Sequence, residues 1–342
     1  MRWMLLLACL TLGGCQAGYF FHVARGHLDL MGERRPVGEV LGEGELAELQ
    51  RQRLEQARAI LAFARTELGL ETGGSYRDYV HLDRNWVVWN LFAAPEFSME
   101  PRQWCYPVAG CVSYRGYFDR ERAERRAEQL RGEDLDVYGS GAVAYSTLGW
   151  FDDPLTTPML ERSPADLAEL LFHELAHRWL YVAGDTRFNE SMATALAAEG
   201  TRRWLAQAEG AGDGTAWRAG TRAQQRVTER VRATRERLEA LYARDLPPAR
   251  LRERKRAIQD ELRGWFAEAR RNDPALAAWA SWFEGPLNNA QLNTLLDYND
   301  RVPAFNRLLL DCGGHWSCFR ERIEQLAEMD APQREQALER LH

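Results

Sequence analysis

The spacing of apolar residues changes along the chain and divides it into two portions. Leucine and isoleucine recur at near-helical spacing over residues 43–68, which predicts a helix. Valine and aromatic residues dominate 79–94, 112–118 and 142–151, as is typical of strands. A charged stretch over 119–131 predicts a further helix between the second and third of these strands.

Helical spacing then continues to the end of the chain. Apolar residues follow a heptad over residues 221–270 on both sides of a proline pair, which predicts an antiparallel helical hairpin. Its arginine and glutamate residues form a solvated face to which we assign no ligand. We therefore expect an α+β domain over 43–342, with a sheet-containing part over about 43–160 and a mainly helical part over about 161–342.

The N-terminus has the pattern of an export signal. The apolar run over residues 5–12 is too short to span a bilayer as a helix, and a positive residue precedes it. The sequence Leu12-Gly13-Gly14-Cys15 resembles a bacterial lipoprotein box. It predicts cleavage of a signal peptide over 1–14, lipidation of Cys15 and a tether over 15–42. The alternative is an ordinary signal peptide with an incidental cysteine.

The residue after the lipidated cysteine predicts which of the two bacterial membranes holds the anchor. Gln16 stands where an aspartate would signal retention in the inner membrane, so we expect an outer-membrane anchor facing the periplasm. The formal net charge of -6 gives no indication of a nucleic-acid partner.

The remaining cysteines form two close pairs, Cys105 with Cys111 and Cys312 with Cys318. An exported chain folds in an oxidising compartment, so two local disulfides are the simplest arrangement. A zinc site made of all four cysteines is the alternative, but the spacings are wider than those of zinc knuckles.

The strongest chemical signal is the sequence His173-Glu174-Leu175-Ala176-His177. Side chains at positions i and i+4 project from one face of a helix, so the two histidines can bind a single zinc ion. Glu174 then flanks the metal and can take a proton from zinc-bound water.

The surroundings of this motif predict a capped amphipathic helix. Ser163-Pro164-Ala165-Asp166 has the signature of a helix N-terminus, and Gly184 marks the end. At about 100° per residue, one face is apolar and the other carries the motif. The apolar face comprises Ala168, Leu171, Phe172, Leu175, Ala176, Trp179 and Val182. We expect this face to pack into a core and the motif to meet a cleft.

A catalytic zinc ion usually has three protein ligands and one open position. No histidine occurs between His177 and His315, which excludes a metzincin and leaves a carboxylate as the third ligand. Glu190 follows a turn after which a returning helix would bring it to the metal. Asp185 and Glu199 are the alternatives, and Glu199 lies on the opposite side of that helix from Glu190.

Two resemblances extend this interpretation. Asn189-Glu190-Ser191-Met192-Ala193 resembles the Asn-Glu-x-x-Ala box of the gluzincin peptidases, which implies that Glu190 is a zinc ligand. The chain also resembles the bacterial putative aminopeptidase family of zinc-motif lipoproteins, and this implies a zincin-like catalytic domain. The segments that carry the second resemblance are 110–118, 138–155, 173–193, 287–291, Tyr298 and 302–305.

The implied activity is zinc-dependent hydrolysis of peptide bonds, with Glu174 as the base. Gluzincins often stabilise the oxyanion with a tyrosine or histidine. Tyr298 is our candidate for this role, with Tyr114 and Tyr145 as alternatives. The predicted strand over 142–151 would pair with an extended peptide substrate.

Two other functions remain open. The first is a zinc amidase or endopeptidase that acts on another envelope amide, such as a peptidoglycan cross-link. The second is a non-catalytic lipoprotein that holds zinc for structure alone. A purely structural site has no use for a base, so the intact Glu174 argues against the last.

We predict that Cys15 is the lipidated N-terminus of the mature protein, because Leu12-Gly13-Gly14-Cys15 has the features that the lipoprotein signal peptidase accepts. Mass spectrometry of the mature N-terminus is the measurement. An unmodified terminus, or cleavage at another position, would contradict this assignment.

Overall fold

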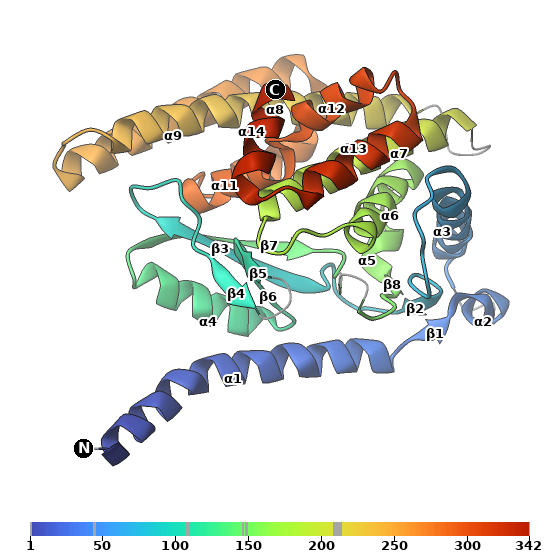
Figure 1. The fold of residues 1–342 in the computed structure, drawn as a ribbon, viewed down its shortest axis with the longest axis horizontal. Coiled ribbons are helices and arrows are strands. Elements are labelled where there is room, and N and C mark those ends of the chain that lie inside the picture. Colours follow the sequence, from blue (N-terminus) through green and yellow to red (C-terminus); the bar gives the residue numbers. More distant parts are fainter. Residues whose placement is uncertain are drawn as a thin grey trace.

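A small antiparallel sheet enclosed by helices lies at the centre of the fold, as a computed structural model shows (Figure 1). The structure describes residues 2–43, 46–106, 110–145, 147, 150–207 and 214–341, with side chains from residue 17 onward. The strands are β1 (Arg35–Pro36), β2 (Asp78–Val80), β3 (Val88–Pro95), β4 (Trp104–Tyr106), β5 (Gly110–Val112), β6 (Tyr114–Tyr117), β7 (Leu135–Ala142) and β8 (Leu155–Thr156).

Helices make up most of the described chain and almost all of it after β8, which confirms the α+β fold class with a mainly helical C-terminal part. They are α1 (Arg2–Gly32), α2 (Val37–Gly42), α3 (Glu48–Glu67), α4 (Arg120–Arg131), α5 (Thr157–Leu160), α6 (Pro164–Trp179), α7 (Thr186–Gln207), α8 (Thr215–Tyr242), α9 (Pro248–Asn272), the 3-10 helix η1 (Pro274–Trp279), α10 (Ala280–Phe283), α11 (Asn289–Asn299), α12 (Val302–Asp311), α13 (Trp316–Glu328) and α14 (Ala331–Leu341).

The central sheet has the order β6-β3-β7, and both of its pairings are antiparallel. Helix α4 covers one face and α11 lies against the other (Figure 1). Consecutive residues Leu91–Ala94 of β3 are therefore buried, because side chains on both faces are covered. Two smaller sheets, β1-β2-β8 and the β4-β5 hairpin, flank this layer.

Helix α6 contributes its apolar face to the largest apolar core, where it packs against several other helices. The Ser163 side chain caps the helix by accepting a hydrogen bond from the Asp166 N–H at 3.2 Å, as the sequence indicates. The predicted apolar face packs into a core shared with α3, α7, α12 and α13. Leu171, Phe172 and Ala176 are completely buried there, whereas Trp179 and Val182 lie at the margin of the core.

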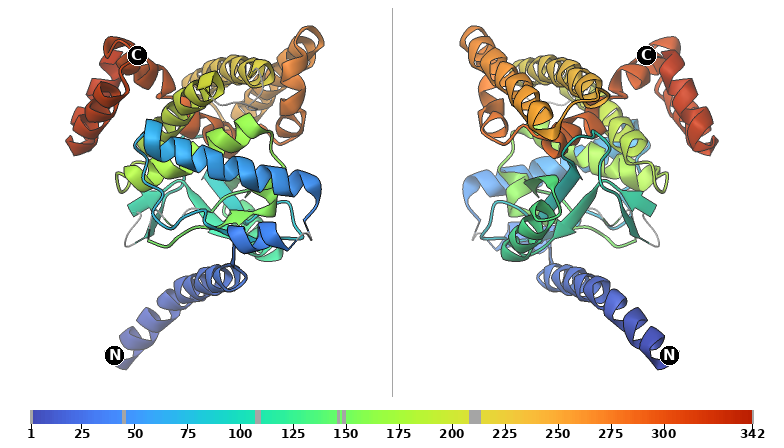
Figure 2. Two further views of the ribbon diagram at one scale, coloured as in Figure 1. Left: turned by 90° about the vertical axis from the view of Figure 1, so that its right-hand side faces the viewer. Right: turned by 90° about the vertical axis from the view of Figure 1, so that its left-hand side faces the viewer.

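The helical hairpin expected over 221–270 is confirmed as the antiparallel pair α8 and α9. Figure 2 shows this hairpin on one side of the molecule and α1 on the opposite side.

Two strand predictions are wrong. Residues 79–94 do not form one strand, because polar residues at 83–85 interrupt it and leave β2 and β3 in different sheets. The strand expected over 142–151 instead ends at Ala142. Thr147 donates hydrogen bonds from both its N–H (3.1 Å) and its hydroxyl (2.9 Å) to Asp153, which favours a local turn over a strand ladder. Residues 146, 148 and 149 lie outside the described residues.

The segment expected to be a tether is helical and contacts the domain. Tyr19 of α1 donates a hydrogen bond to the Gly116 carbonyl oxygen at 3.1 Å, and α2 buries Val37 and Val40 in the core. At Gly26, α1 comes so close to the Phe118 ring that an added Cβ would lie 2.4 Å from it. No helix in the described part of the chain is long and apolar enough to cross a bilayer.

An ion pair of the buried Lys255 with Asp136 joins the hairpin to the sheet. Lys255, the only lysine of the chain, lies 2.5 Å from Asp136 and donates to the Glu96 carbonyl oxygen at 2.8 Å. The N–H of Asn289 at the start of α11 donates to the same Asp136 carboxylate at 2.9 Å. The Asn289 side-chain nitrogen also lies 3.0–3.1 Å from three carbonyl oxygens of residues 95–98. The solvated-face interpretation of the hairpin therefore fails at Lys255.

We expect Lys255→Met to lower the free energy of unfolding by about 3–5 kcal/mol, because the substitution leaves the largely covered Asp136 carboxylate, 15% exposed, without its cation. Arg250→Met on the same helix is the control, since Arg250 pairs with Glu253 through side chains that are 68% and 60% exposed. The control should lose no more than about 1 kcal/mol. Urea unfolding measures both, and equal losses would refute a special role for Lys255.

Candidate metal centre

The turn between α6 and α7 is closed by the side chain of Asn189. Its oxygen accepts a hydrogen bond from the Val182 N–H at 2.8 Å, and its nitrogen donates to the Val182 carbonyl oxygen at 2.7 Å. Gly184 has a φ of 82°, which favours glycine, and Asp185 accepts from the Phe188 N–H at 3.1 Å near the start of α7. The chain therefore reverses sharply, and α7 returns alongside α6.

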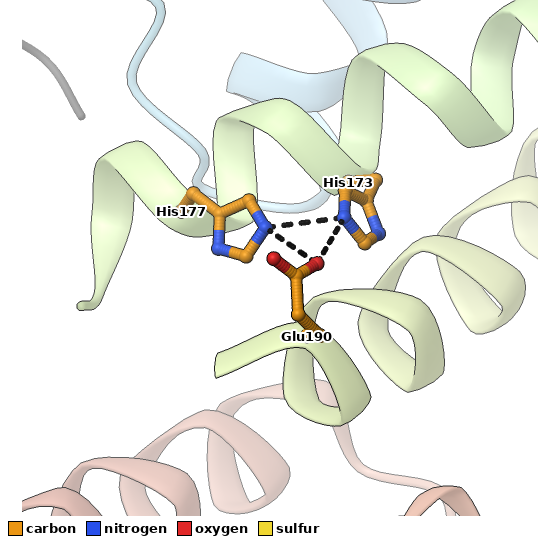
Figure 3. A group of neighbouring side chains, drawn as sticks. All are labelled: His173, His177 and Glu190. Atoms are coloured by element: carbon orange, nitrogen blue, oxygen red, sulfur yellow. Dashed lines mark hydrogen bonds and ion pairs between the residues drawn. The ribbon is translucent and has the colours of Figure 1, made fainter. Parts of the chain in front are cut away.

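This reversal brings together the two histidines of α6 and Glu190 of α7 (Figure 3). The Nε2 atoms of His173 and His177 are 3.1 Å apart, and Glu190 Oε2 lies 3.3 Å and 3.4 Å from them. A tetrahedral ion with bonds of about 2.0–2.1 Å holds its ligand atoms roughly 3.4 Å apart. The three side chains could therefore hold one metal ion without rearrangement.

The charges at this group favour a cation. Burial alone would raise the pKa of Glu190, but the facing imidazoles outweigh burial and lower this pKa to about 2. Burial opposes protonation of His177, yet the Glu190 carboxylate raises the pKa of this imidazole above its usual value. A negative carboxylate thus shares a small buried space with two nitrogen ligands.

Glu174 faces the same cavity from the same helix. Burial raises the pKa of its carboxyl group, although the neighbouring imidazoles act in the opposite direction. No side chain of the described residues forms a hydrogen bond or ion pair with Glu174. Its carboxylate is therefore available to accept a proton from a bound water molecule or substrate.

The cavity in front of the group has a volume of about 840 Å³. Its walls come from the sheet strands β3, β6 and β7, from the polar face of α6, and from α7, α8 and α11. This confirms the expectation that the motif meets a cleft. Ser140 and Ala142 of β7 line the same cavity as the two histidines of α6.

The three tyrosines considered for the oxyanion role, Tyr298, Tyr114 and Tyr145, all line the cavity. The Tyr298 ring stacks on His173 with a centroid distance of 5.9 Å and an interplanar angle of 18°. Burial raises the pKa of Tyr298 and of Tyr114 well above the usual value, and the Glu190 charge adds to the effect, so both hydroxyls stay protonated. Tyr145 also lines the cavity, but its ring packs edge-to-face on Phe118 at 5.0 Å.

The sequence analysis missed two residues of the same wall. Tyr181 lies four positions after His177 with its ring 6.5 Å from that imidazole, and burial raises its pKa. Glu169 lies four positions before His173 and also lines the cavity. Burial raises the pKa of Glu169, although a hydrogen bond from Trp217 opposes this. Extending the i, i+4 spacing back by one turn would have indicated Glu169, whereas Tyr181 lies past the end of α6 at Trp179, where helical spacing no longer applies.

The structure places the two alternative carboxylate ligands elsewhere. Asp185 lies near the start of α7 and pairs with Arg334 at 2.8 Å. Glu199 pairs with Arg202 and Arg203, each at 2.7 Å. Neither belongs to the group formed by the histidines and Glu190.

Two serines connect the metal-binding group to the sheet and to α11. Ser113 beside β6 donates a hydrogen bond to the Asp297 carboxylate at 2.7 Å. Ser191, the neighbour of Glu190, donates to the Asp297 carbonyl oxygen at 3.2 Å. Asp297 precedes Tyr298, so these bonds fix Glu190 and Tyr298 relative to each other.

The cysteines lie apart from the metal-binding group. Cys105 and Cys111 form a disulfide across the β4-β5 hairpin, and Cys312 and Cys318 form one between α12 and α13. With both bonds formed, no thiolates remain for a four-cysteine zinc site. The side chain of Cys15 lies outside the described part of the structure.

Comparison with known proteins identifies the family of the chain. The model of the putative aminopeptidase family matches residues 18–338. No curated protein and no solved structure gives a significant match. The matched range includes the metal-binding group, Glu174 and Tyr298 and covers nearly all of the sequence. The chain therefore belongs to the putative aminopeptidase family.

Proposed function

We propose that the protein is a zinc-dependent peptidase, and more specifically an aminopeptidase. The observation that carries this proposal is the grouping of His173, His177 and Glu190 at 3.1–3.4 Å. Beside it lies a partly buried Glu174, whose carboxylate has no hydrogen bond or ion pair with another side chain of the described residues. Two imidazole nitrogens and one carboxylate are the protein ligands of hydrolytic zinc sites, which keep one position open for water or substrate. The family description supports a peptidase.

The roles of the protein groups follow from their positions. Zinc, when bound, supplies a Lewis acid that acidifies water and polarises a carbonyl. Glu174 takes the proton of the attacking water and passes it to the leaving amine, as its unpaired carboxylate allows. Tyr298 stays protonated and donates a hydrogen bond to the oxyanion, while its stacking on His173 limits its motion.

We place the substrate backbone along β7. Residues 140–142 pair with β3 on one side and line the cavity beside α6. An extended peptide can add as a further strand at that edge, with its scissile carbonyl in front of the histidines. We had expected residues 142–151 to pair with the peptide substrate, and we now assign this pairing to the last residues of β7.

We further propose that the enzyme acts in the cell envelope, held through a lipid on Cys15. The support is the sequence of the N-terminal segment together with the two disulfides, which suit an oxidising compartment. A structural role for zinc alone is disfavoured, because it would leave the Glu174 carboxylate beside the metal-binding group without a purpose.

Substitutions at the four central residues should separate metal binding from proton transfer. His173→Ala and His177→Ala should lose zinc and peptide hydrolysis together, because each leaves only two protein ligands. Glu190→Gln should weaken zinc binding, since a neutral amide is a poorer ligand than a carboxylate. Glu174→Gln should keep zinc while kcat falls by about 10²–10⁴-fold.

Metal analysis beside a peptide-hydrolysis assay decides these roles. Glu199→Gln is the matched control, because Glu199 is also a glutamate of α7 but pairs with surface arginines. Full activity of Glu174→Gln, or zinc binding by Glu190→Gln as tight as in the wild type, would remove that residue from its assigned role. A peptide library with free and blocked N-termini then separates an aminopeptidase from an endopeptidase or amidase.

Tyr298→Phe should lower kcat with little change in KM, because the hydroxyl acts only when the oxyanion forms. Tyr145→Phe is the control, since Tyr145 lines the same cavity while its ring packs on Phe118. Steady-state kinetics on one peptide measures both variants. Wild-type turnover in Tyr298→Phe would exclude this tyrosine from the reaction.

A further inference from the structure

The wall of the cavity holds a carboxylate that neither metal binding nor proton transfer uses. Glu169 lies on α6 one helical turn before His173 and therefore on the same face as the metal-binding histidines. It lies outside the group formed with Glu190. Besides Glu174 and Glu190, the cavity is lined by the carboxylates of Asp166 and Glu169. Asp166 lies at the helix N-terminus and accepts a hydrogen bond from the Ser163 hydroxyl at 2.6 Å, so Glu169 is the nearer of these two to the histidines along α6.

The partners of Glu169 fix its position without neutralising its charge. Trp217 of α8 donates a hydrogen bond from its indole nitrogen to Glu169 Oε2 at 2.7 Å. An indole N–H is a neutral donor, so it orients the carboxylate and leaves the negative charge in place. In the described part of the chain, no arginine, lysine or histidine lies within ion-pair distance of Glu169. Arg162 and His173 act on it only from farther away.

A carboxylate withdrawn from water is costly unless a cation accompanies it. Here the cavity opens onto the Glu169 carboxylate, and the described residues supply no cation within ion-pair distance of it. A ligand that enters with a positive nitrogen would complete the pair and gain a charge-assisted hydrogen bond.

The spacing along α6 suits the amino terminus of a peptide. One helical turn covers about 5.4 Å along the axis. A free amine lies two covalent bonds from the carbonyl carbon of its own residue, and one hydrogen bond of about 2.8 Å extends this reach to roughly 5 Å. An amine held by Glu169 therefore leaves the first peptide bond close to the histidines.

We propose that Glu169 is the substrate-binding carboxylate that recognises a cationic nitrogen, namely the free α-ammonium group of the substrate. This inference rests on the proposed peptidase function, because it makes that site an aminopeptidase site. A basic side chain of the first residue offers the same chemistry, so the test distinguishes the two sources.

The binding test uses the Glu174→Gln background, in which hydrolysis is suppressed. Titration calorimetry compares leucinamide, N-acetyl-leucinamide and N-acetyl-lysinamide on the zinc-loaded protein. With Glu169 intact, leucinamide should bind about tenfold to a hundredfold more tightly than its acetylated form. Glu169→Gln should abolish this preference while the zinc content stays unchanged. Tight binding of N-acetyl-lysinamide that depends on Glu169 would assign the site to a basic side chain and overturn the α-ammonium proposal.

Kinetics on the protein with Glu174 intact provides the second arm. Glu169→Gln should lower kcat/KM for a peptide with a free N-terminus by about tenfold to a hundredfold, mainly through KM, and Glu169→Asp should restore part of it. Asp166→Asn removes an equal charge one turn earlier and should keep the preference for the free amine. An unchanged preference in Glu169→Gln would refute the inference and leave the peptidase standing. An inactive wild-type enzyme would instead refute the peptidase, and the binding arm would still decide the role of Glu169.

Discussion

The paired hydrogen bonds between Asn189 and the backbone of Val182 are the constraint on which the site depends. Any helix can place two histidines one turn apart on one face, but the third ligand must come from another element. Because Asn189 closes the turn, the residue next to it is delivered to the histidines at a fixed height along α6. The amide and the carboxylate of the Asn-Glu pair thus serve one purpose, in which the first residue sets the backbone and the second completes the metal-binding group.

The remaining walls are attached to this turn through polar contacts. Ser191 and Ser113 both bond to Asp297, so α7, the sheet and α11 meet directly behind Glu190. Lys255, Asp136 and Asn289 connect the other end of α11 to the hairpin and to β7. Such buried bonds cost desolvation and are satisfied only in one geometry, so they specify how the helical part sits on the sheet.

Local physics explains what the sequence could reveal about this protein. The cap at Ser163, the apolar stripe of α6 and the histidine spacing all depend on residues within a few positions of one another. Long-range placement was accessible only where a resemblance supplied it, as for Tyr298, whose ring reaches His173 from a distant helix. Strand β7 was missed except for its last residue, Ala142. Gly139 and Gly141 weaken the strand signal, and the register with β3 that stabilises the strand is not a local property.

The burial of the only lysine offers a way to measure how often the α8-α9 hairpin separates from the sheet. Apart from the chain terminus, amine-reactive reagents find a single target, and the side chain of Lys255 is only 7% exposed. Acylation can therefore proceed only when the α8-α9 hairpin separates from the sheet, so its rate reports the frequency of that opening. Lys255 is thus a built-in chemical probe of the contact between the α8-α9 hairpin and the sheet.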